Sequence, residues 1–280
     1  MLRYLIKFYY IGLDKYYGSQ RQKNFLTIED QILNALIRRK YIHNKKNFGF
    51  EAASRTDRYV SARASTFSFL TEKKPILMEI NSALPKEIGV WGFTEVPLDF
   101  SSRFNAQKRH YKYIFPYPLT HLNKEYNFNL DLMVKGLNKF LGKHNFQNFS
   151  KRDRENPKTI RTIEKIGYNL INDYIILDFK SKGFLRQQIR RMVKKLIELG
   201  KGLLSFKEFG KLFDPSEFHS YQPADPYGLI LWNIEYDTKI NFKYDEKSKK
   251  RMKQYFQSEF FTHDQKAQLF RILKHNNFGE

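Results

Sequence analysis

Residues 53–62 read Ala-Ser-Arg-Thr-Asp-Arg-Tyr-Val-Ser-Ala, and this stretch decides how the whole chain is interpreted. It places one carboxylate, Asp57, between two arginines, Arg55 and Arg58, among mostly small neighbours. The chain carries 50 Lys and Arg against 29 Asp and Glu. A carboxylate flanked by guanidiniums on so basic a protein indicates acid–base or nucleophilic chemistry on an anionic polymer. The alternative is an ordinary salt bridge in a surface loop.

The charge of the chain restricts its partners. The formal net charge is +21, which favours polyanions or anionic membranes. No run approaches the roughly 18 apolar residues of a spanning helix. Residues 1–7 alternate like a strand and show no long apolar region of a signal peptide. We therefore expect a nucleic-acid partner and no membrane association.

Several classes of cofactor find no support in the sequence. The chain has no Cys, which excludes disulfides and thiolate metal sites and is compatible with a reducing cytoplasm, where we expect the protein. Its seven His residues show neither HxxxH nor HExxH spacing. Walker and GxGxxG patterns are absent as well. We expect no metal and no cofactor.

Hydrophobic periodicity divides the chain into strands and helices. In the first part it predicts strands over 3–11, 48–53, 63–70 and 88–96, and helices over 27–40 and 76–84. In the second part it predicts strands over 108–115, 160–170, 174–180 and 229–236, and helices over 130–141, 184–199 and 206–213. The tripeptide 171–173 is a plausible hairpin turn between two of these strands.

This order of elements predicts an α+β fold, in which two similar α/β lobes surround a central, largely antiparallel sheet. We expect an N-terminal lobe over 1–104, which contains Asp57, and a C-terminal lobe over 105–240. Residues 241–280 are polar and basic, and they predict a helical C-terminal extension.

The strand over 108–115 contains a second chemical pattern. Period two puts Arg109, Tyr111 and Tyr113 on one face. A rigid aromatic ring beside a guanidinium can stack on a nucleobase. The alternative is that these aromatic side chains belong to the core.

The helix over 184–199 contains a third pattern. At helical spacing, Arg190 borders the apolar arc and Arg186 falls inside it. A guanidinium at the rim of a buried face is costly unless it meets a carboxylate or a phosphate. Arg190 therefore requires a buried anion, unless its long side chain reaches water.

A fourth stretch, residues 17–22, is a polar loop after the first strand. Its amides, Gln20 and Arg21 could contact phosphate or ribose. By itself it has the composition of an ordinary loop.

Together these stretches resemble the TruA family of tRNA pseudouridine synthases. Residues 18–22 resemble the family's G-[WS]-Q-R-Q loop, and residues 55–62 resemble its R-T-D-x-G-V-[HS]-A motif. The family stretch L-P … F-x-A-R-F-x-A has a counterpart in residues 84–106. Residues 109–113 match R-x-Y-x-Y, and residues 184–190 match F-L-x-x-x-[VI]-R. Each piece is short, but their order and spacing over residues 3–236 are specific.

The resemblance implies the pseudouridine synthase fold and a cofactor-free conversion of uridine to pseudouridine in tRNA. In this family the glycosidic bond breaks, the base turns, and a carbon–carbon bond joins it again. Asp57 would be the essential aspartate, acting as a nucleophile on ribose or base or as the acceptor of the 2′ proton. Tyr111 would stack on the target ring and assist proton transfer, and Arg190 would pair with Asp57.

The remaining site residues follow from the same resemblance and from the basic patches. Arg55 would hold the target nucleotide out of the stack. We expect the other RNA contacts from Arg58, Arg21, Gln20, Arg109 and Arg186, together with Tyr111. Tyr59 stands where the family usually has glycine, and it would be strained if that position needs φ > 0.

The form of the motifs is closer to archaeal and eukaryotic members of the family. It implies a target in the anticodon arm, at uridines 38–40 of tRNA, and a homodimeric enzyme. Two other hypotheses stay open. One is a non-catalytic tRNA- or RNA-binding protein of the same fold, and the other is a pseudouridine synthase with a different RNA target.

Overall fold

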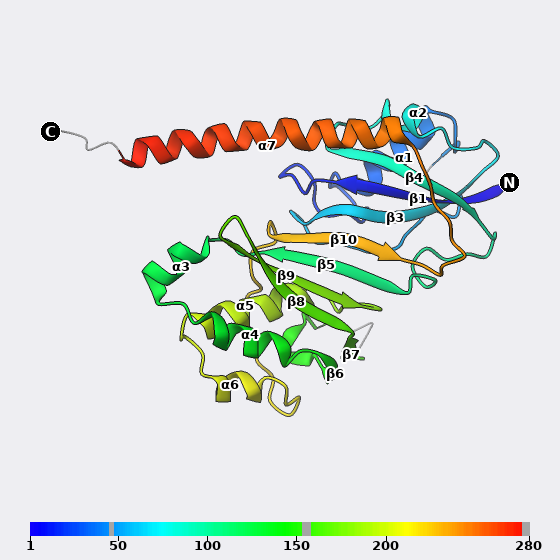
Figure 1. The fold of residues 1–280 in the computed structure, drawn as a ribbon. Helices are drawn as coiled ribbons and strands as arrows, with labels where there is room; N and C mark the ends of the chain where they lie inside the picture. The colour runs from blue at the N-terminus through cyan, green and yellow to red at the C-terminus, as the bar shows by residue number, and fades with distance from the viewer. Residues whose placement is uncertain (45–47, 153–157, 276–280) are drawn as a thin grey trace.

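The computed structural model describes residues 1–44, 48–152 and 158–275, and its central feature is one large sheet (Figure 1). The nine strands lie in the order β11-β4-β1-β3-β10-β5-β9-β8, with β2 paired to β3. Their bounds are β1 (Leu2–Tyr10), β2 (Glu51–Ala52), β3 (Ser61–Thr71), β4 (Ile88–Val96), β5 (Lys108–Ile114), β8 (Lys165–Ile171), β9 (Tyr174–Ser181), β10 (Leu229–Glu235) and β11 (Lys243–Tyr244). A separate two-stranded sheet consists of β6 (Gly142–Asn145) and β7 (Ile160–Ile163).

Strand β10 joins the two halves of the large sheet. It runs parallel to β3, where Leu231 lies opposite Ala62, and antiparallel to β5, where Leu231 lies opposite Tyr111. Among the strand pairs of the described residues, β3–β10 is the one parallel pair. The loop that contains Asp57 leads into β3, so β10 brings this loop close to Tyr111. The predicted α+β fold around a largely antiparallel sheet is confirmed.

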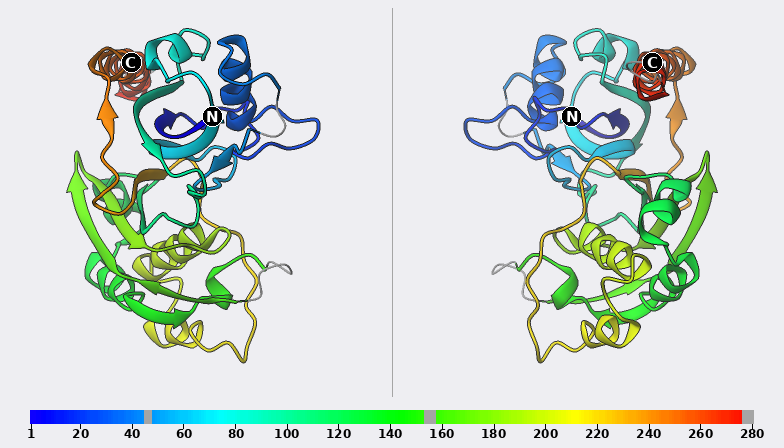
Figure 2. Two further views of the ribbon diagram at one scale, coloured as in Figure 1. Left: turned by 90° about the vertical axis from the view of Figure 1, so that its right-hand side faces the viewer. Right: turned by 90° about the vertical axis from the view of Figure 1, so that its left-hand side faces the viewer.

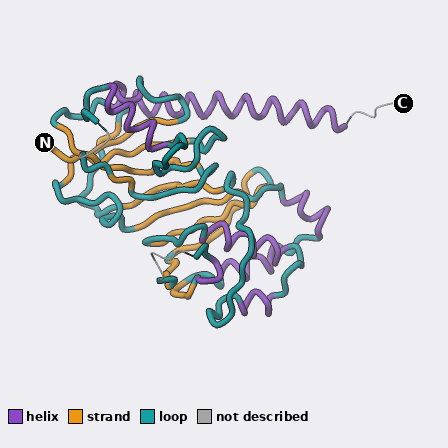
Figure 3. The backbone as a smooth tube through the Cα atoms, turned by 180° about the vertical axis from the view of Figure 1, so that it is seen from behind, coloured by secondary structure: helices purple, strands orange, loops and turns teal. Residues whose placement is uncertain are grey.

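Helices pack against both ends of this sheet (Figure 2). One group adjoins the first strands, and a second group adjoins β5, β8 and β9 (Figure 3). Their bounds are α1 (Ile28–Arg38), α2 (Leu77–Asn81), α3 (Leu119–Tyr126), α4 (Leu130–Asn138), the 3₁₀ helix η1 (Gln147–Phe149), α5 (Gln188–Gly200), α6 (Phe206–Lys211) and α7 (Glu246–His275). None of the helices in the described ranges combines the length and the apolar character that a membrane span requires.

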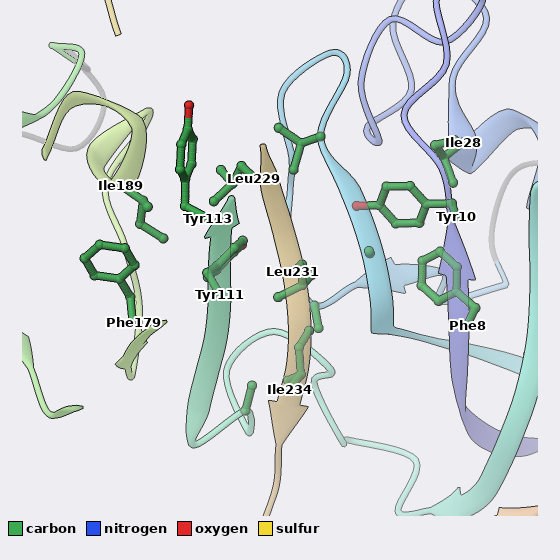
Figure 4. Close-up of a cluster of buried hydrophobic side chains, with 14 of the residues drawn as sticks. Phe8, Tyr10, Ile28, Tyr111, Tyr113, Phe179, Ile189, Leu229, Leu231 and Ile234 are labelled. Atoms are coloured by element: carbon green, nitrogen blue, oxygen red, sulfur yellow. The ribbon is translucent and has the colours of Figure 1, made fainter. Parts of the chain in front are cut away.

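One hydrophobic core extends through both halves of the molecule. Figure 4 shows part of it: Ile189 of α5 and Phe179 of β9 lie next to Tyr111 of β5, and side chains of β10 and β1 follow across the sheet. Tyr111 and Tyr113 are both buried in this core, as expected for alternate residues of one strand. The core therefore fixes α5 and β5 relative to each other.

The start of α1 and the turn between β8 and β9 both follow from local residue types. Thr27 caps α1, and its side chain accepts a hydrogen bond from the Asp30 amide. Asn172 and Asp173 join β8 to β9, and both have positive φ, 49° and 68°. Positive φ at both central residues is typical of the tight turn that matches the twist of a hairpin.

The long helix α7 packs on the opposite face of the sheet from α1 and extends beyond the strands (Figure 1). Tyr9 points to α7, whereas its neighbours Phe8 and Tyr10 point into the main core. Met252, near the start of α7, is buried against Tyr9, and side chains farther along such as Phe270 are exposed. The predicted helical extension is thus present, although its residues 276–280 lie outside the described residues. We keep the division into residues 1–104, 105–240 and 241–280 as a proposal.

Helix α5 begins later than the sequence predicts. Its first residue is Gln188 rather than Phe184, because Gln187 adopts a left-handed conformation with φ 59°. The side chain of Gln188 accepts a hydrogen bond from the Leu185 amide at 2.8 Å, which stabilises the turn before the helix. Arg186 therefore lies in this turn and is exposed, not inside the apolar arc of the helix.

Replacement of Gly200 by Ala is expected to destabilise the protein. A Cβ at this last residue of α5 would lie 2.3 Å from ring atoms of Phe128, which is itself buried. Overpacking of this kind costs about 1–3 kcal/mol of unfolding free energy. Urea unfolding should show the loss. Gly210→Ala is the matched control, since the nearest atom there is the flexible Lys139 Nζ at 3.3 Å, and an unchanged Gly200→Ala midpoint would contradict the packing.

Candidate active site

The centre of the candidate site is an ion pair between Asp57 and Arg190. Arg190 Nη1 lies 2.8 Å from Asp57 Oδ2, across 133 positions of sequence. The Arg190 side chain is only 11% exposed, and that of Asp57 is 33% exposed. The buried guanidinium has therefore found the anion that its helical position requires, and the expected pairing is present. The carboxylate stays open to solvent on one side.

A second hydrogen bond fixes the direction of the Arg190 side chain. Its Nε donates to the carbonyl oxygen of Ala224 at 2.8 Å, and the Ala224 amide donates to the Arg190 carbonyl oxygen at 3.0 Å. The segment before β10 thus holds the guanidinium from one side while Asp57 holds it from the other. This arrangement uses the fork geometry of arginine, which lysine lacks.

The loop of Asp57 is anchored to the loop over residues 17–22. The Thr56 amide donates to Ser19 Oγ at 2.8 Å, and the Ser19 amide donates to the Thr56 carbonyl at 3.2 Å. Gly18 has φ 89°, and a Cβ there would lie 3.0 Å from the Thr56 oxygen. Glycine is required at this close approach. Residues 18 and 19 therefore position the loop of Asp57, which is a different role from the phosphate contact that the sequence suggests for residues 17–22.

Tyr111 contacts the loop of Asp57 through Ser54. The two hydroxyls share a hydrogen bond of 2.9 Å, and the Tyr111 ring meets Phe184 edge-on at 5.4 Å. Burial raises the pKa of the Tyr111 hydroxyl, and the charge of Asp57 acts in the same direction. The phenol is therefore neutral at physiological pH. Ser54 and Phe184 are site residues that sequence reasoning did not assign, although both lie inside the quoted motifs.

Arg109 holds three backbone segments together. Its guanidinium donates to the carbonyl oxygens of Ala53, Arg103 and Lys182. These bonds connect the start of the Asp57 loop to the segments that flank β5 and β9. The predicted RNA contact of Arg109 stays a prediction, while its bracing role is present in the structure.

Arg58 does not pair with Asp57. Its guanidinium lies over the rings of Tyr17 and Tyr59, at 4.0 and 4.6 Å from their centroids, and it donates to the Asp14 carbonyl at 2.8 Å. Tyr59 has φ 69°, so the position where the family usually has glycine is left-handed here. The carboxylate is thus held by a distant arginine and not by its two neighbours in sequence.

The other predicted RNA-binding residues have exposed side chains. Arg55, Gln20, Arg21 and Arg186 are all exposed. None of the ion pairs among the described residues includes any of these three arginines. The described residues also contain no group of three or more His, Asp or Glu side chains arranged to hold a metal ion.

Comparisons with known proteins show which family this chain is similar to. A family model described as tRNA pseudouridine synthase matches residues 137–237. A tRNA pseudouridine synthase A of Methanosphaera stadtmanae is 32% identical over 98% of this chain and 100% of its own length. Proteins of the same name from Methanothermobacter thermautotrophicus and Pyrococcus furiosus are also 32% identical, over 98% and 97% of this chain and 95% and 97% of their own.

A chain from a crystal structure of a Cbf5-Nop10-Gar1 complex is similar over 71% of this chain and 55% of its own length, with 10% identity and a TM-score of 0.31. That likeness is too weak to support an argument. The full-length similarity to the archaeal proteins is sufficient by itself. This chain belongs to the tRNA pseudouridine synthase A family, which is a family of isomerases.

Proposed function

We propose that this protein converts uridine to pseudouridine in tRNA, at positions 38–40 of the anticodon stem-loop. The observation that carries the proposal is the Asp57–Arg190 pair, closed on one side by core and open on the other, with Tyr111 beside it. The sequence similarity to proteins named tRNA pseudouridine synthase A supports tRNA as the substrate class.

The proposed reaction is an internal exchange of bonds. The N1–C1′ glycosidic bond breaks, the uracil ring turns, and C5 bonds to C1′. The hydrogen on C5 leaves as a proton, and N1 gains a proton, so atoms and electrons balance without an oxidant or a reductant. The residues of the chain need only bind, orient and move protons.

Asp57 is proposed to act directly on the target nucleotide. Arg190 occupies Oδ2 of its carboxylate, and the side chain is one-third exposed toward the space a nucleotide would enter. A guanidinium at hydrogen-bond distance fixes the direction of the carboxylate. The Asp57 carboxylate can attack ribose or base as a nucleophile, and it can also accept the 2′ proton.

Tyr111 is proposed to contact the target ring and to assist proton transfer through its hydroxyl. Because the phenol is neutral and bonded to Ser54, it can donate a proton or relay one. With its pKa raised above the ordinary value of about 10, ionisation of Tyr111 should produce no alkaline limb in the rate below that pH.

The Tyr111→Phe variant should lower kcat by about 10²-fold and leave KM for tRNA nearly unchanged, because a positioned proton donor contributes roughly 10²–10⁴. Steady-state rates on purified tRNA give both constants. Tyr236→Phe is the matched control, since the hydroxyl of this half-buried tyrosine likewise shares a hydrogen bond with a side-chain hydroxyl, that of Thr66, at 2.6 Å. A full kcat in Tyr111→Phe would limit Tyr111 to a packing role.

The exposed arginines are proposed to bind the RNA backbone. Arg55, two positions before Asp57, would hold the target nucleotide out of the stack. Arg186 would neutralise one phosphate, so Arg186→Gln should reduce the slope of log Kd against log salt by about one. Filter binding at several salt concentrations measures the slope, with Lys124→Gln on the distant α3 as control. An unchanged slope would remove Arg186 from the interface.

Release of tritium from tRNA labelled at C5 of uridine tests the proposed reaction, with Asp57→Ala as the inactive control. If the wild-type protein binds tRNA but releases no label, the protein is a non-catalytic RNA-binding member of the fold. Mapping of the pseudouridines in the product tests the proposed target in the anticodon arm. Modification at other positions would contradict positions 38–40. We also propose a homodimer in the cytoplasm, and sedimentation of the purified protein tests the dimer.

A further inference from the structure

Five side chains form a continuous stack next to the Asp57 loop, and we call them the aromatic ladder. Phe25 stacks on Tyr17 at 4.3 Å, and the Arg58 guanidinium lies between the rings of Tyr17 and Tyr59. Tyr59 then packs on Tyr227 at 4.6 Å with an interplanar angle of 31°. The ladder contains four rings and one cation.

The backbone of Tyr59 indicates that its ring has a function. Its φ of 69° is a conformation that glycine adopts freely and that is a genuine outlier for a bulky residue. Strained residues of this kind persist mainly at functional sites. In addition, Arg58 Nε is buried and has no hydrogen-bond partner among the described residues. Packing alone does not explain why these two residues are present.

The ladder ends beside the catalytic pair. Arg58 and Tyr59 directly follow Asp57 in the chain, and Tyr227 lies three residues after Ala224, whose carbonyl oxygen binds Arg190. Tyr59 and Tyr227 come from the two halves of the sequence. Their contact therefore joins the segment that contains Asp57 to the segment that holds Arg190.

Tyr227, the last ring of the ladder, suits a nucleobase better than a phosphate. Tyr227 is 57% exposed. Its hydroxyl donates to Asp14 Oδ1 at 2.9 Å, and its amide donates to Asp225 Oδ1 at 2.8 Å. Two carboxylates beside the ring repel a phosphate group, whereas the face of a neutral base can still stack on the ring.

We propose that Tyr227 is a stacking site for an unpaired nucleobase adjacent to the target uridine, with Tyr59 and Arg58 as its rigid support. This inference rests on the proposed function and adds a specificity-determining contact to it. Extrusion of the target leaves its neighbour without a stacking partner, and single-stranded bases are commonly received by aromatic side chains. The ladder supplies such a surface a few residues from Asp57.

The Tyr227→Leu variant should raise KM for tRNA about tenfold and change kcat less than twofold, because base stacking contributes to binding and not to the chemical step. Steady-state kinetics measures both. Tyr126→Leu is the matched control, since Tyr126 is likewise an exposed tyrosine and is the last residue of the distant α3. A KM within twofold of wild type, or a loss confined to kcat, would overturn the proposal.

The Tyr59→Gly variant separates stacking from structural support. Glycine accepts φ 69° without strain, so the melting temperature should not fall. Loss of the ring that supports Tyr227 should still raise KM by about fivefold to tenfold. If the ladder only braces the fold, the melting temperature falls and KM for the remaining folded protein stays at its wild-type value.

A modified substrate tests the ligand directly. Two tRNAs are compared, each with an abasic nucleotide on one side of the target uridine. The tRNA that lacks the stacking base should bind wild-type protein about tenfold more weakly than intact tRNA. Tyr227→Leu should show no further loss with that abasic tRNA, because the contact is already absent. If the loss of affinity from Tyr227→Leu and the loss from the abasic tRNA multiply in full, Tyr227 and the base do not interact.

The two proposals fail in different ways. If the wild-type protein forms no pseudouridine, the proposed function is wrong. Filter binding of intact and abasic tRNA to wild type and to Tyr227→Leu then tests the stacking role of Tyr227 separately. If wild type is active and Tyr227→Leu binds and turns over tRNA normally, only the ladder is wrong.

Discussion

The Asp57→Asn variant should lose at least about 10³-fold in the rate of pseudouridine formation and keep its affinity for tRNA. Asparagine preserves the shape of the side chain but can neither attack as a carboxylate nor accept a proton. Removal of a negative charge from a surface that binds a polyanion should not weaken binding. Single-turnover tritium release measures the rate, and filter binding measures the affinity.

The control for Asp57→Asn is Asp99→Asn, which removes an exposed carboxylate from the segment before β5. Its rate and affinity should both match wild type. A melting temperature for each variant shows whether the fold is preserved. Release by Asp57→Asn above about one-hundredth of the wild-type rate would show that the reaction does not depend on this carboxylate.

The Arg190→Ala variant should lower kcat by about 10²-fold or more and change KM for tRNA little. The substitution removes the hydrogen bonds to both Asp57 Oδ2 and the Ala224 carbonyl oxygen, so the carboxylate loses the charge-assisted bond that fixes its direction. Breaking a fully buried pair costs about 3–5 kcal/mol of stability. The loss here should be smaller because Asp57 is partly exposed, and rates should be measured below the melting temperature of the variant.

Two further variants show whether the loss of kcat in Arg190→Ala is specific to this arginine. Arg191→Ala removes the next cation on the same helix, which has no carboxylate partner among the described ion pairs, and should leave kcat near wild type. Arg190→Lys keeps the charge but cannot bind two oxygens in fork geometry, so its kcat should lie between wild type and Arg190→Ala. Equal losses of kcat and tRNA affinity in Arg190→Ala would assign Arg190 to phosphate binding instead.

Local patterns predicted most of the elements, because period two and helical spacing depend only on which residues are buried. The strand over 88–96 and the hairpin at residues 171–173 are examples. The position of β10 between β3 and β5 was not predicted, since pairing between distant strands leaves no signal in either strand alone. α3 was missed as well; it is a single short helix with one buried side chain, Leu122.

At the candidate site, too, local patterns predicted some features and missed those that depend on contacts between distant residues. The requirement of Arg190 for an anion followed from its place on an amphipathic helix, whereas its partner, Asp57, came from the family resemblance. Proximity in sequence was misleading for Arg58, because adjacent side chains point in different directions and its guanidinium found two rings instead. Arg186 was misplaced because the left-handed conformation of Gln187 delays the start of α5.

The insertion of β10 between β3 and β5 has a consequence for biosynthesis. Ala62 of β3 precedes Leu231, its partner on β10, by 169 residues (231 − 62), so at about 5–20 residues per second the ribosome needs roughly 8–34 s more to complete this pairing. During this interval the Ser61–Ala62 segment of β3 has no β10 to cover it. An uncovered strand edge recruits foreign strands. The nascent chain should therefore depend on chaperones more than the finished enzyme does.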